Sequence, residues 1–133
     1  GDNALAYHVS CFHRSRLDAG NIVTYTSTAP ENAEKARDLL LNECEKLCTD
    51  LVSAEELASA KASILGEYTI GRQTFASQSG ELAMIGVYGL PLNEPQEYLR
   101  HVEATTAEQV REVAKKYLQT KSYWMGVAIG GEK

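Results

Sequence analysis

A chain of 133 residues is long enough for one domain and too short for two independent hydrophobic cores. Hydrophobic residues make up 44% and charged residues 23%, which is typical of a globular rather than a disordered protein. The net charge is −5 and the basic residues are scattered, which argues against nucleic-acid binding, because a phosphate backbone requires clustered Lys and Arg. The longest apolar stretches, such as Leu39–Leu41, are too short to span a bilayer, so we expect no membrane partner.

The first thirty residues predict a β-hairpin. Large side chains alternate along the first strand, and a turn is expected at Leu17–Asn21. The second strand, Ile22–Thr28, is rich in β-branched residues. The alternating residues of the first strand are Leu5, Tyr7, Val9 and Cys11 on one face, with Ala6, His8, Ser10 and Phe12 on the other.

A long amphipathic helix is predicted to follow Pro30. Proline suits the first turn of a helix, and Glu31 and Glu34 complement the positive end of the helix dipole. Apolar side chains then recur at steps of three and four residues over about five turns. They are Ala33, Ala36, Leu40, Cys44, Leu47 and Leu51.

Ser53 with Glu56 forms a capping-box pattern that opens a second helix. Its inward face is predicted to carry Leu57, Ala60, Ile64 and Tyr68. Glycines weaken the pattern, so we expect a break between Gly71 and Gly80, followed by a helical stretch through Leu82–Gly86 that ends near Gly89–Pro91.

The remaining residues predict two helices and one strand. Glu97–Val102 forms a short helix, and Thr106 with Gln109 is a second capping box, before an apolar face of Val110, Val113, Ala114 and Tyr117. Tyr123–Ile129 is predicted to be a strand, closed by Gly130 and Gly131. This order predicts an α+β fold, with helices on one face of an antiparallel or mixed sheet. Three strands make a small sheet for so many helices, so we expect its edge to be completed by missing strands or by another chain.

The residue chemistry shows no active site. Of the three histidines, no two have the spacing that places two metal ligands on one helical face: His8 and His13 are expected on opposite faces of a strand, and His101 on a helix in solvent. The odd number of cysteines (Cys11, Cys44 and Cys48) excludes a complete disulfide framework and favours buried thiols in a reducing compartment. No Gly-x-Ser-x-Gly elbow or phosphate-binding glycine loop is found.

Several segments in order resemble the C-terminal domain of the insulinase-type (M16, pitrilysin-like) zinc peptidases. Ala4–Val9 resembles the "GLAYSV" strand of that family, and Gly20–Asn32 resembles its strand followed by "PEN" at a helix start. Ser53–Lys61 resembles the "T-x-E-E-L-x-x-A-K" helix opening. Glu81–Pro91, Val102–Val110 and Ala114–Leu118 follow in the family's order, so the resemblance covers nearly the whole chain.

The resemblance implies a LuxS/MPP-like metallohydrolase fold for residues 1–133, as one C-terminal-type domain that lacks its first strands and helix. In the family, an N-terminal domain holds zinc with a His-x-x-Glu-His motif, which is absent here, so no catalytic or metal role is carried over to any residue. The C-terminal domain contributes an Arg and, seven residues later, a Tyr that help to bind the substrate peptide. Tyr7 matches that Tyr, whereas the Arg would precede Gly1.

The expected function is therefore a non-catalytic domain that binds peptide substrate and forms part of the chamber of a zinc metalloendopeptidase. Its expected partners are the N-terminal zinc-bearing domain, the peptide substrate and a second copy paired through an exposed sheet edge. We expect zinc only in the catalytic domain, no activity of the chain alone, and a cytoplasmic location. Two alternatives stay open: an inactive M16-like scaffold or processing partner, and an unrelated ligand-binding module with an apolar pocket away from Tyr7.

Overall fold

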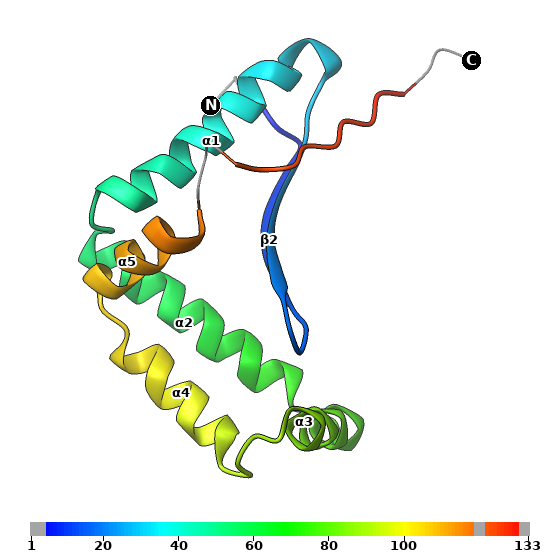
Figure 1. Cartoon of the computed structure of the whole chain (residues 1–133), viewed down its shortest axis with the longest axis vertical. Helices are drawn as coiled ribbons and strands as arrows, with labels where there is room; N and C mark the ends of the chain where they lie inside the picture. Colours follow the sequence, from blue (N-terminus) through cyan, green and yellow to red (C-terminus); the bar gives the residue numbers. More distant parts are fainter. Residues whose placement is uncertain (1–4, 119–121, 131–133) are drawn as a thin grey trace. The chain divides into compact units, whose positions relative to one another are not determined.

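The computed structural model describes residues 5–118 and 122–130, and in these residues one antiparallel hairpin is followed by a series of helices (Figure 1). The fold class is α+β, as predicted. The elements are β1 (His8–Ser15), β2 (Gly20–Ser27), a 3-10 turn η1 (Pro30–Asn32), α1 (Ala33–Thr49), α2 (Ala54–Gly71), α3 (Phe75–Tyr88), α4 (Glu94–Ala104) and α5 (Ala107–Tyr117).

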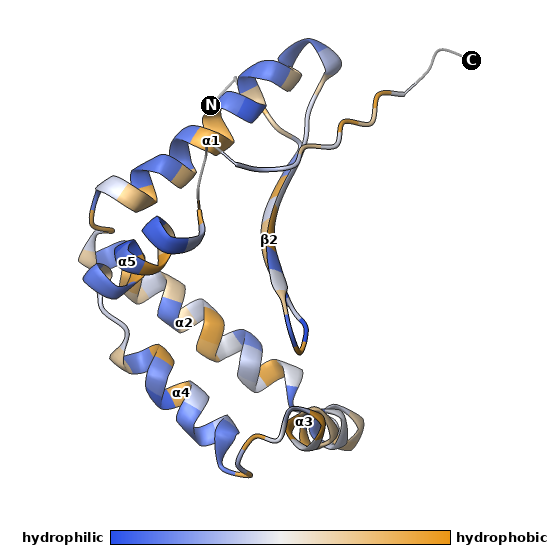
Figure 2. Cartoon of the chain, viewed as in Figure 1, coloured by the Kyte–Doolittle hydropathy of each residue, from blue (hydrophilic) through white to orange (hydrophobic). Residues whose placement is uncertain are grey.

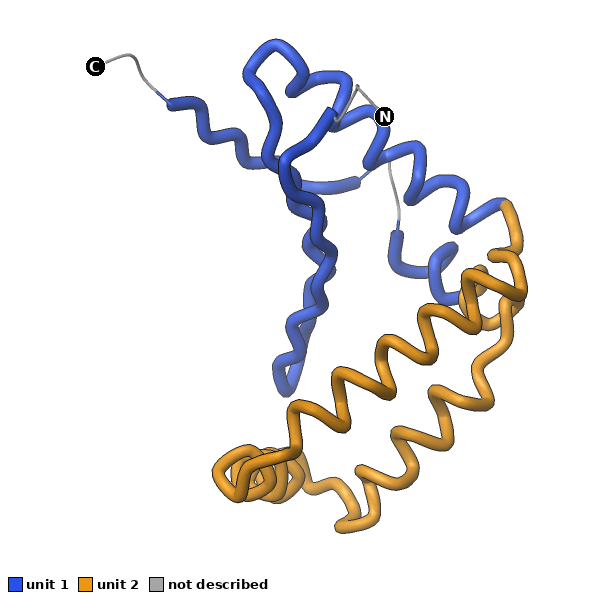
Figure 3. The backbone as a smooth tube through the Cα atoms, turned by 180° about the vertical axis from the view of Figure 1, so that it is seen from behind, with its two compact units in different colours: residues 1–49, 113–133 blue, residues 50–112 orange. Residues whose placement is uncertain are grey.

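The chain divides into two compact units (Figure 3). Unit 1 combines residues 1–49 with residues 113–133, and unit 2 is the continuous segment 50–112. The hairpin and α1 belong to unit 1, whereas α2, α3 and α4 belong to unit 2. The boundary falls inside α5, between Glu112 and Val113.

The predicted hairpin is confirmed and forms the described sheet. Its strands run antiparallel, with register pairs from His8 opposite Ser27 to Ser15 opposite Gly20. The connection is tight, because the N–H of Arg16 donates to the carbonyl of Ala19 at 2.8 Å. A Cβ atom at Gly20 would approach the carbonyl oxygen of Arg14 to 3.1 Å, so a larger residue there would need a small shift of the turn.

The third strand predicted for Tyr123–Ile129 is wrong for this structure, because these residues form no strand. A strand is stabilised by hydrogen bonds to a neighbour, and among the described residues the sheet contains only β1 and β2. The side chains of this segment stay exposed, with Trp124 fully exposed. Ala4, at the start of the first predicted strand, and Gly131, predicted to close the last one, lie outside the described residues.

Unit 1 also contains the predicted long helix. Pro30 begins η1, which leads directly into α1, and Ala36 is the buried residue of that helix. Leu40, Cys44 and Leu47 of the predicted apolar face are half-buried. Leu51 lies beyond the end of α1 and is 48% exposed, so the predicted helix was one half-turn too long.

The capping box predicted at Ser53 is confirmed at the start of α2. Ser53 Oγ accepts from the N–H of Glu56 at 3.2 Å, and the N–H of Ser53 donates to Glu56 Oε2 at 3.0 Å. The predicted inward face is partly wrong, since Ala60 and Ile64 are exposed while Leu57 and Tyr68 are half-buried. The half-buried face of α2 instead consists of Leu57, Lys61, Leu65 and Tyr68, one residue further along the helix at its two middle positions than predicted.

Helices α2 and α4 lie side by side and antiparallel in unit 2 (Figure 1). Lys61 Nζ donates to the carbonyl of Glu103 at 2.7 Å. At the other end of the pair, the rings of Tyr68 and Tyr98 lie 5.3 Å apart between centroids. Helix α4 is longer than the predicted Glu97–Val102 stretch, because Glu94 and Pro95 begin it.

The predicted break between Gly71 and Gly80 is confirmed by the gap between α2 and α3. Thr74 caps α3 by accepting from the N–H of Ser77 at 3.1 Å. The helix ends at Gly89, whose φ of 65° lies in the left-handed region that favours glycine. The N–H of Leu90 then donates to the carbonyl of Ile85 at 2.9 Å, which turns the chain back toward α4.

Few side chains are buried in either unit. Hydrophilic residues dominate α4 and α5, whereas hydrophobic residues recur along α2 and α3 (Figure 2). Among the described residues, no helix is long and apolar enough to cross a membrane. The buried residues of the described chain are Ala36, Ile85, Pro95 and Ala114.

Candidate functional site

Tyr7 lies immediately before β1, on the hairpin of unit 1. Its backbone N–H donates to the carbonyl of Ser27 at 2.8 Å, so the main chain is held at the end of the hairpin. Tyr7 is 79% exposed, so it is not a core residue of this structure. A phenol held in this way presents a hydrogen-bond donor and acceptor to solvent.

The backbone around Tyr7 is fixed on both sides. The hydroxyl of Thr28 donates to the carbonyl of Leu5, which ties the segment before β1 to the residue after β2. One residue after Tyr7, the carbonyl of His8 accepts from Thr26 Oγ1 at 3.2 Å. These contacts position the backbone that carries Tyr7 while leaving its side chain accessible.

The three histidines are not brought together in a metal site. His8 lies on β1 with its ring 5.9 Å from that of Tyr25, and His13 lies near Ser15 on the same strand. His101 is an exposed residue in the last turn of α4, where it complements the negative end of the helix dipole. Within residues 5–118 and 122–130, no group of three or more His, Cys, Asp or Glu side chains is arranged to hold a metal ion.

All three cysteines are free thiols, and two of them lie on one face of α1. Cys48 Sγ donates to the carbonyl of Cys44 at 3.2 Å and lies 3.6 Å from the carbonyl of Leu118. Burial raises the pKa of Cys44, and nearby thiols including Cys11 raise it further, so the neutral thiol is favoured. Cys44 and Cys48 are half-buried, whereas Cys11 is exposed on β1, contrary to the prediction that all three are buried.

Unit 2 contains a polar cluster that the sequence analysis missed. Tyr68 on α2 donates a hydrogen bond to Glu81 Oε1 on α3, and Arg72 Nε pairs with Glu81 Oε2 at 2.7 Å. The guanidinium of Arg72 also lies 5.4 Å from the centre of the Tyr68 ring. Desolvation and the Glu81 carboxylate raise the pKa of Tyr68 to about 12, so its hydroxyl stays protonated as a donor.

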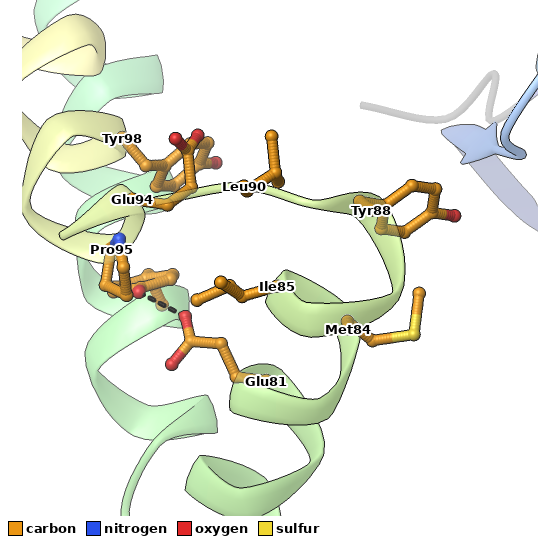
Figure 4. A pocket seen from close by; sticks show the side chains of 9 residues that line it. Glu81, Met84, Ile85, Tyr88, Leu90, Glu94, Pro95 and Tyr98 are labelled. Carbon is orange, nitrogen blue, oxygen red and sulfur yellow. Dashed lines mark hydrogen bonds between the residues drawn. The ribbon is translucent and has the colours of Figure 1, made fainter. Parts of the chain in front are cut away.

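A largely apolar hollow of about 230 Å³ lies beside this cluster (Figure 4). Ile85 points toward Pro95 of α4, and Met84 and Tyr88 line the α3 side of the hollow (Figure 4). The hollow is formed by α2, the end of α3 and the start of α4. The periodicity of the sequence describes each helix by itself and therefore did not predict the hollow. The lining residues are Tyr68, Glu81, Met84, Ile85, Tyr88, Leu90, Glu94, Pro95 and Tyr98.

Comparison with known proteins links residues 2–64, the segment that contains Tyr7, to a family model described as the Peptidase M16 inactive domain. A solved structure of a peptidase M16 inactive domain from Pseudomonas fluorescens has the same fold, with a TM-score of 0.79 and 24% sequence identity. The match covers 90% of this chain and 28% of that one, so the chain spans just over a quarter of the matched protein's length. A comparison with curated proteins found no match.

The matched segment covers the first three predicted resemblances, Ala4–Val9, Gly20–Asn32 and Ser53–Lys61. The shared fold covers 90% of the chain, so the likeness extends beyond residue 64. The predicted resemblance is therefore confirmed: residues 2–64 match the family model of the Peptidase M16 inactive domain, and the chain has the fold of a solved M16 inactive domain.

Proposed function

We propose that this chain is a substrate-binding domain of a zinc metalloendopeptidase, in which Tyr7 contacts the substrate peptide and the domain forms part of the chamber around it. The observation that carries the proposal is the exposed phenol of Tyr7, 79% accessible, within the segment that matches the M16 inactive domain. A buried tyrosine would have had a sufficient structural explanation. An exposed one on a fixed backbone is available for a ligand.

The chemistry of Tyr7 suits this role. A neutral phenol donates one hydrogen bond to a peptide carbonyl and can do the same to an oxyanion that develops during cleavage. Because the N–H of Tyr7 is already bonded to Ser27, the side chain is presented from a backbone that does not need to be ordered on binding. Substrate contact is therefore assigned to the phenol oxygen.

The partner that supplies catalysis is a zinc-bearing N-terminal M16 domain. Zinc there would activate water and polarise the scissile carbonyl. No residue of this chain is assigned to the metal, because the His-x-x-Glu-His motif is absent from the sequence. That this chain binds no metal stays a prediction. That the substrate is a peptide stays a prediction as well.

The experiment that tests the proposal mixes this chain with a zinc-bearing catalytic domain and compares Tyr7→Phe with Tyr25→Phe. Both phenols are exposed on the hairpin, and only Tyr7 is assigned to substrate. We expect Tyr7→Phe to lower kcat/KM for a peptide by about tenfold, the loss of one hydrogen bond in the reacting complex. Tyr25→Phe should leave kcat/KM unchanged. Equal activity of both variants would favour the scaffold alternative.

We also propose that the hairpin pairs with a second copy through a strand edge. In the part of the chain that the structure describes, neither β1 nor β2 has a second strand partner. Val9 and Tyr25 are 59% and 51% exposed, so the strands present apolar side chains as well as free backbone groups. Finally, the three free thiols support a cytoplasmic location, where reducing conditions preserve them.

A further inference from the structure

We propose that the hollow in unit 2 binds one large apolar side chain of a peptide segment that carries a neighbouring Lys or Arg. The proposal rests on the proposed function only in taking a peptide as the ligand. The site lies on α2, α3, the α3–α4 connection and α4, and involves no residue of the hairpin. The volume of the hollow, its apolar lining and its carboxylates favour such a ligand.

The size of the hollow limits what it can hold. At about 230 Å³ it is below the ~300–1,000 Å³ of sites for cofactors and drug-sized ligands, so it suits a single side chain. Three apolar or aromatic side chains, Met84, Tyr88 and Leu90, contribute to its walls, and the buried Ile85 lies between them and Pro95 (Figure 4). Met84 and Leu90 are 49% and 43% exposed, and covering them with an apolar group would stabilise a complex.

The charge of the hollow identifies the flanking group. Two carboxylates line it, and they differ in their partners. Glu81 accepts a hydrogen bond from Tyr68 and forms an ion pair with Arg72, whereas Glu94 has no ion-pair partner among the described residues. The carboxylate of the half-buried Glu94 is therefore available to accept a hydrogen bond from a Lys or Arg side chain of the ligand.

The rest of unit 2 reinforces this preference. Residues 50–112 contain ten acidic and four basic side chains, a net charge of −6, whereas the rest of the chain has eight acidic and nine basic, a net charge of +1. The negative charge of the protein is thus concentrated on the unit that contains the hollow. Its field attracts a basic segment and repels an acidic one.

The test measures binding of the full 133-residue chain to a labelled, end-capped peptide with leucine between two lysines, by fluorescence anisotropy. We expect the affinity to fall when serine replaces the leucine and when glutamates replace the lysines. Met84→Ser should weaken binding about fivefold to tenfold, since the apolar wall is lost. Glu94→Gln should weaken it about tenfold and reduce its salt dependence.

Two matched variants serve as controls. Leu82→Ser makes the same kind of change as Met84→Ser, on the same helix but outside the lining of the hollow. Glu67→Gln changes the net charge as Glu94→Gln does, at an exposed site on α2. Both should bind the peptide like the parent chain, and circular dichroism checks that all four variants keep their helices.

Two outcomes overturn the inference. No binding, or binding unaffected by Met84→Ser and Glu94→Gln, removes the hollow as a peptide site. If Met84→Ser changes only the sedimentation of the chain, this surface is an interface between copies. Tyr7→Phe separates the two proposals. If this variant still binds the peptide at the hollow but loses activity in the catalytic mixture, both proposals are supported. If its activity is unchanged while binding still depends on the hollow, only the role of Tyr7 is rejected.

Discussion

The hydroxyl of Tyr68 donates a hydrogen bond to the carboxylate of Glu81, joining α2 to α3 across the turn between them. Arg72, at the end of α2, pairs with the other carboxylate oxygen at 2.7 Å. The two contacts occupy both oxygens of Glu81 and thereby hold α3 against the end of α2. They also leave Glu94 as the lining carboxylate without an ion pair in the described structure.

Tyr68→Phe is expected to lower the free energy of unfolding by about 1 kcal/mol near neutral pH, because Glu81 loses a donor while the ring is kept. The pKa of Tyr68 is raised from 10.0 to about 12, first by desolvation and then by Glu81. The contribution of the protonated Tyr68 hydroxyl to the free energy of unfolding is therefore fully present below pH 10 and is lost as the pH rises toward 12. Urea unfolding across this range should show a decline for the parent chain that Tyr68→Phe reduces.

Tyr98→Phe is the control for that measurement, because its ring packs on Tyr68 and its hydroxyl is not part of the bond to Glu81. It should retain the alkaline decline of the parent. The same decline in Tyr68→Phe would show that the Tyr68–Glu81 bond does not contribute to stability.

Gly89→Ala should destabilise the chain by about 1 kcal/mol, because alanine disfavours the φ of 65° that ends α3. Gly86→Ala is its control: the added methyl group would meet nothing within 4 Å inside the helix. There alanine should stabilise the chain by about 0.5–1 kcal/mol. Thermal unfolding of both variants checks the opposite signs, and a stabilising Gly89→Ala would contradict the left-handed helix end.

Ser53→Ala should lower the free energy of unfolding by about 1 kcal/mol, since the start of α2 loses its cap. Thr49→Ala, at the other side of the α1–α2 connection, removes a hydroxyl that only bonds back to its own helix and should have a smaller effect. Denaturant unfolding compares the two, and equal losses would show that the capping box has no special role.

The same box predicts a dependence on acid pH. Hydrogen bonds from the side chain and backbone of Ser53 lower the pKa of Glu56 below its ordinary 4.5. Because the pKa of Glu56 is lower in the folded chain, its ionised carboxylate stabilises the folded chain at pH values above its ordinary pKa. This stabilisation is lost as the pH falls through the pKa of Glu56 in the folded chain. Unfolding measured between pH 6 and about pH 3 should decline more for the parent than for Glu56→Gln; parallel curves would exclude the contribution.

Pairing of hairpins between copies predicts a concentration-dependent dimer in analytical ultracentrifugation. Val9→Lys places a charge on an exposed edge strand and should shift the chain toward monomer. Val113→Lys, at a residue 56% exposed on α5, introduces the same charge away from the sheet and should leave association unchanged. A strictly monomeric parent chain well above micromolar concentration would contradict the proposal.

The elements that depend on local chemistry were predictable from the sequence. The capping pairs Ser53–Glu56 and Thr106–Gln109 both form the expected reciprocal bonds, because their partners lie three residues apart. The strand at Tyr123–Ile129 was predicted from the residues of that segment alone, yet a strand also needs a hydrogen-bonding neighbour that the segment itself cannot supply. The hollow depends on contacts between three elements, such as Tyr68 to Tyr98, which no local pattern specifies.

The central claim is that this chain contributes to peptide cleavage by binding substrate and has no metal-dependent activity of its own. The most direct test measures peptidase activity with and without zinc for the chain alone, for a catalytic domain carrying His-x-x-Glu-His alone, and for their mixture. We expect zinc-dependent cleavage that requires the mixture or is strongly raised by it, and none from this chain alone. Zinc-dependent cleavage by this chain alone would contradict it.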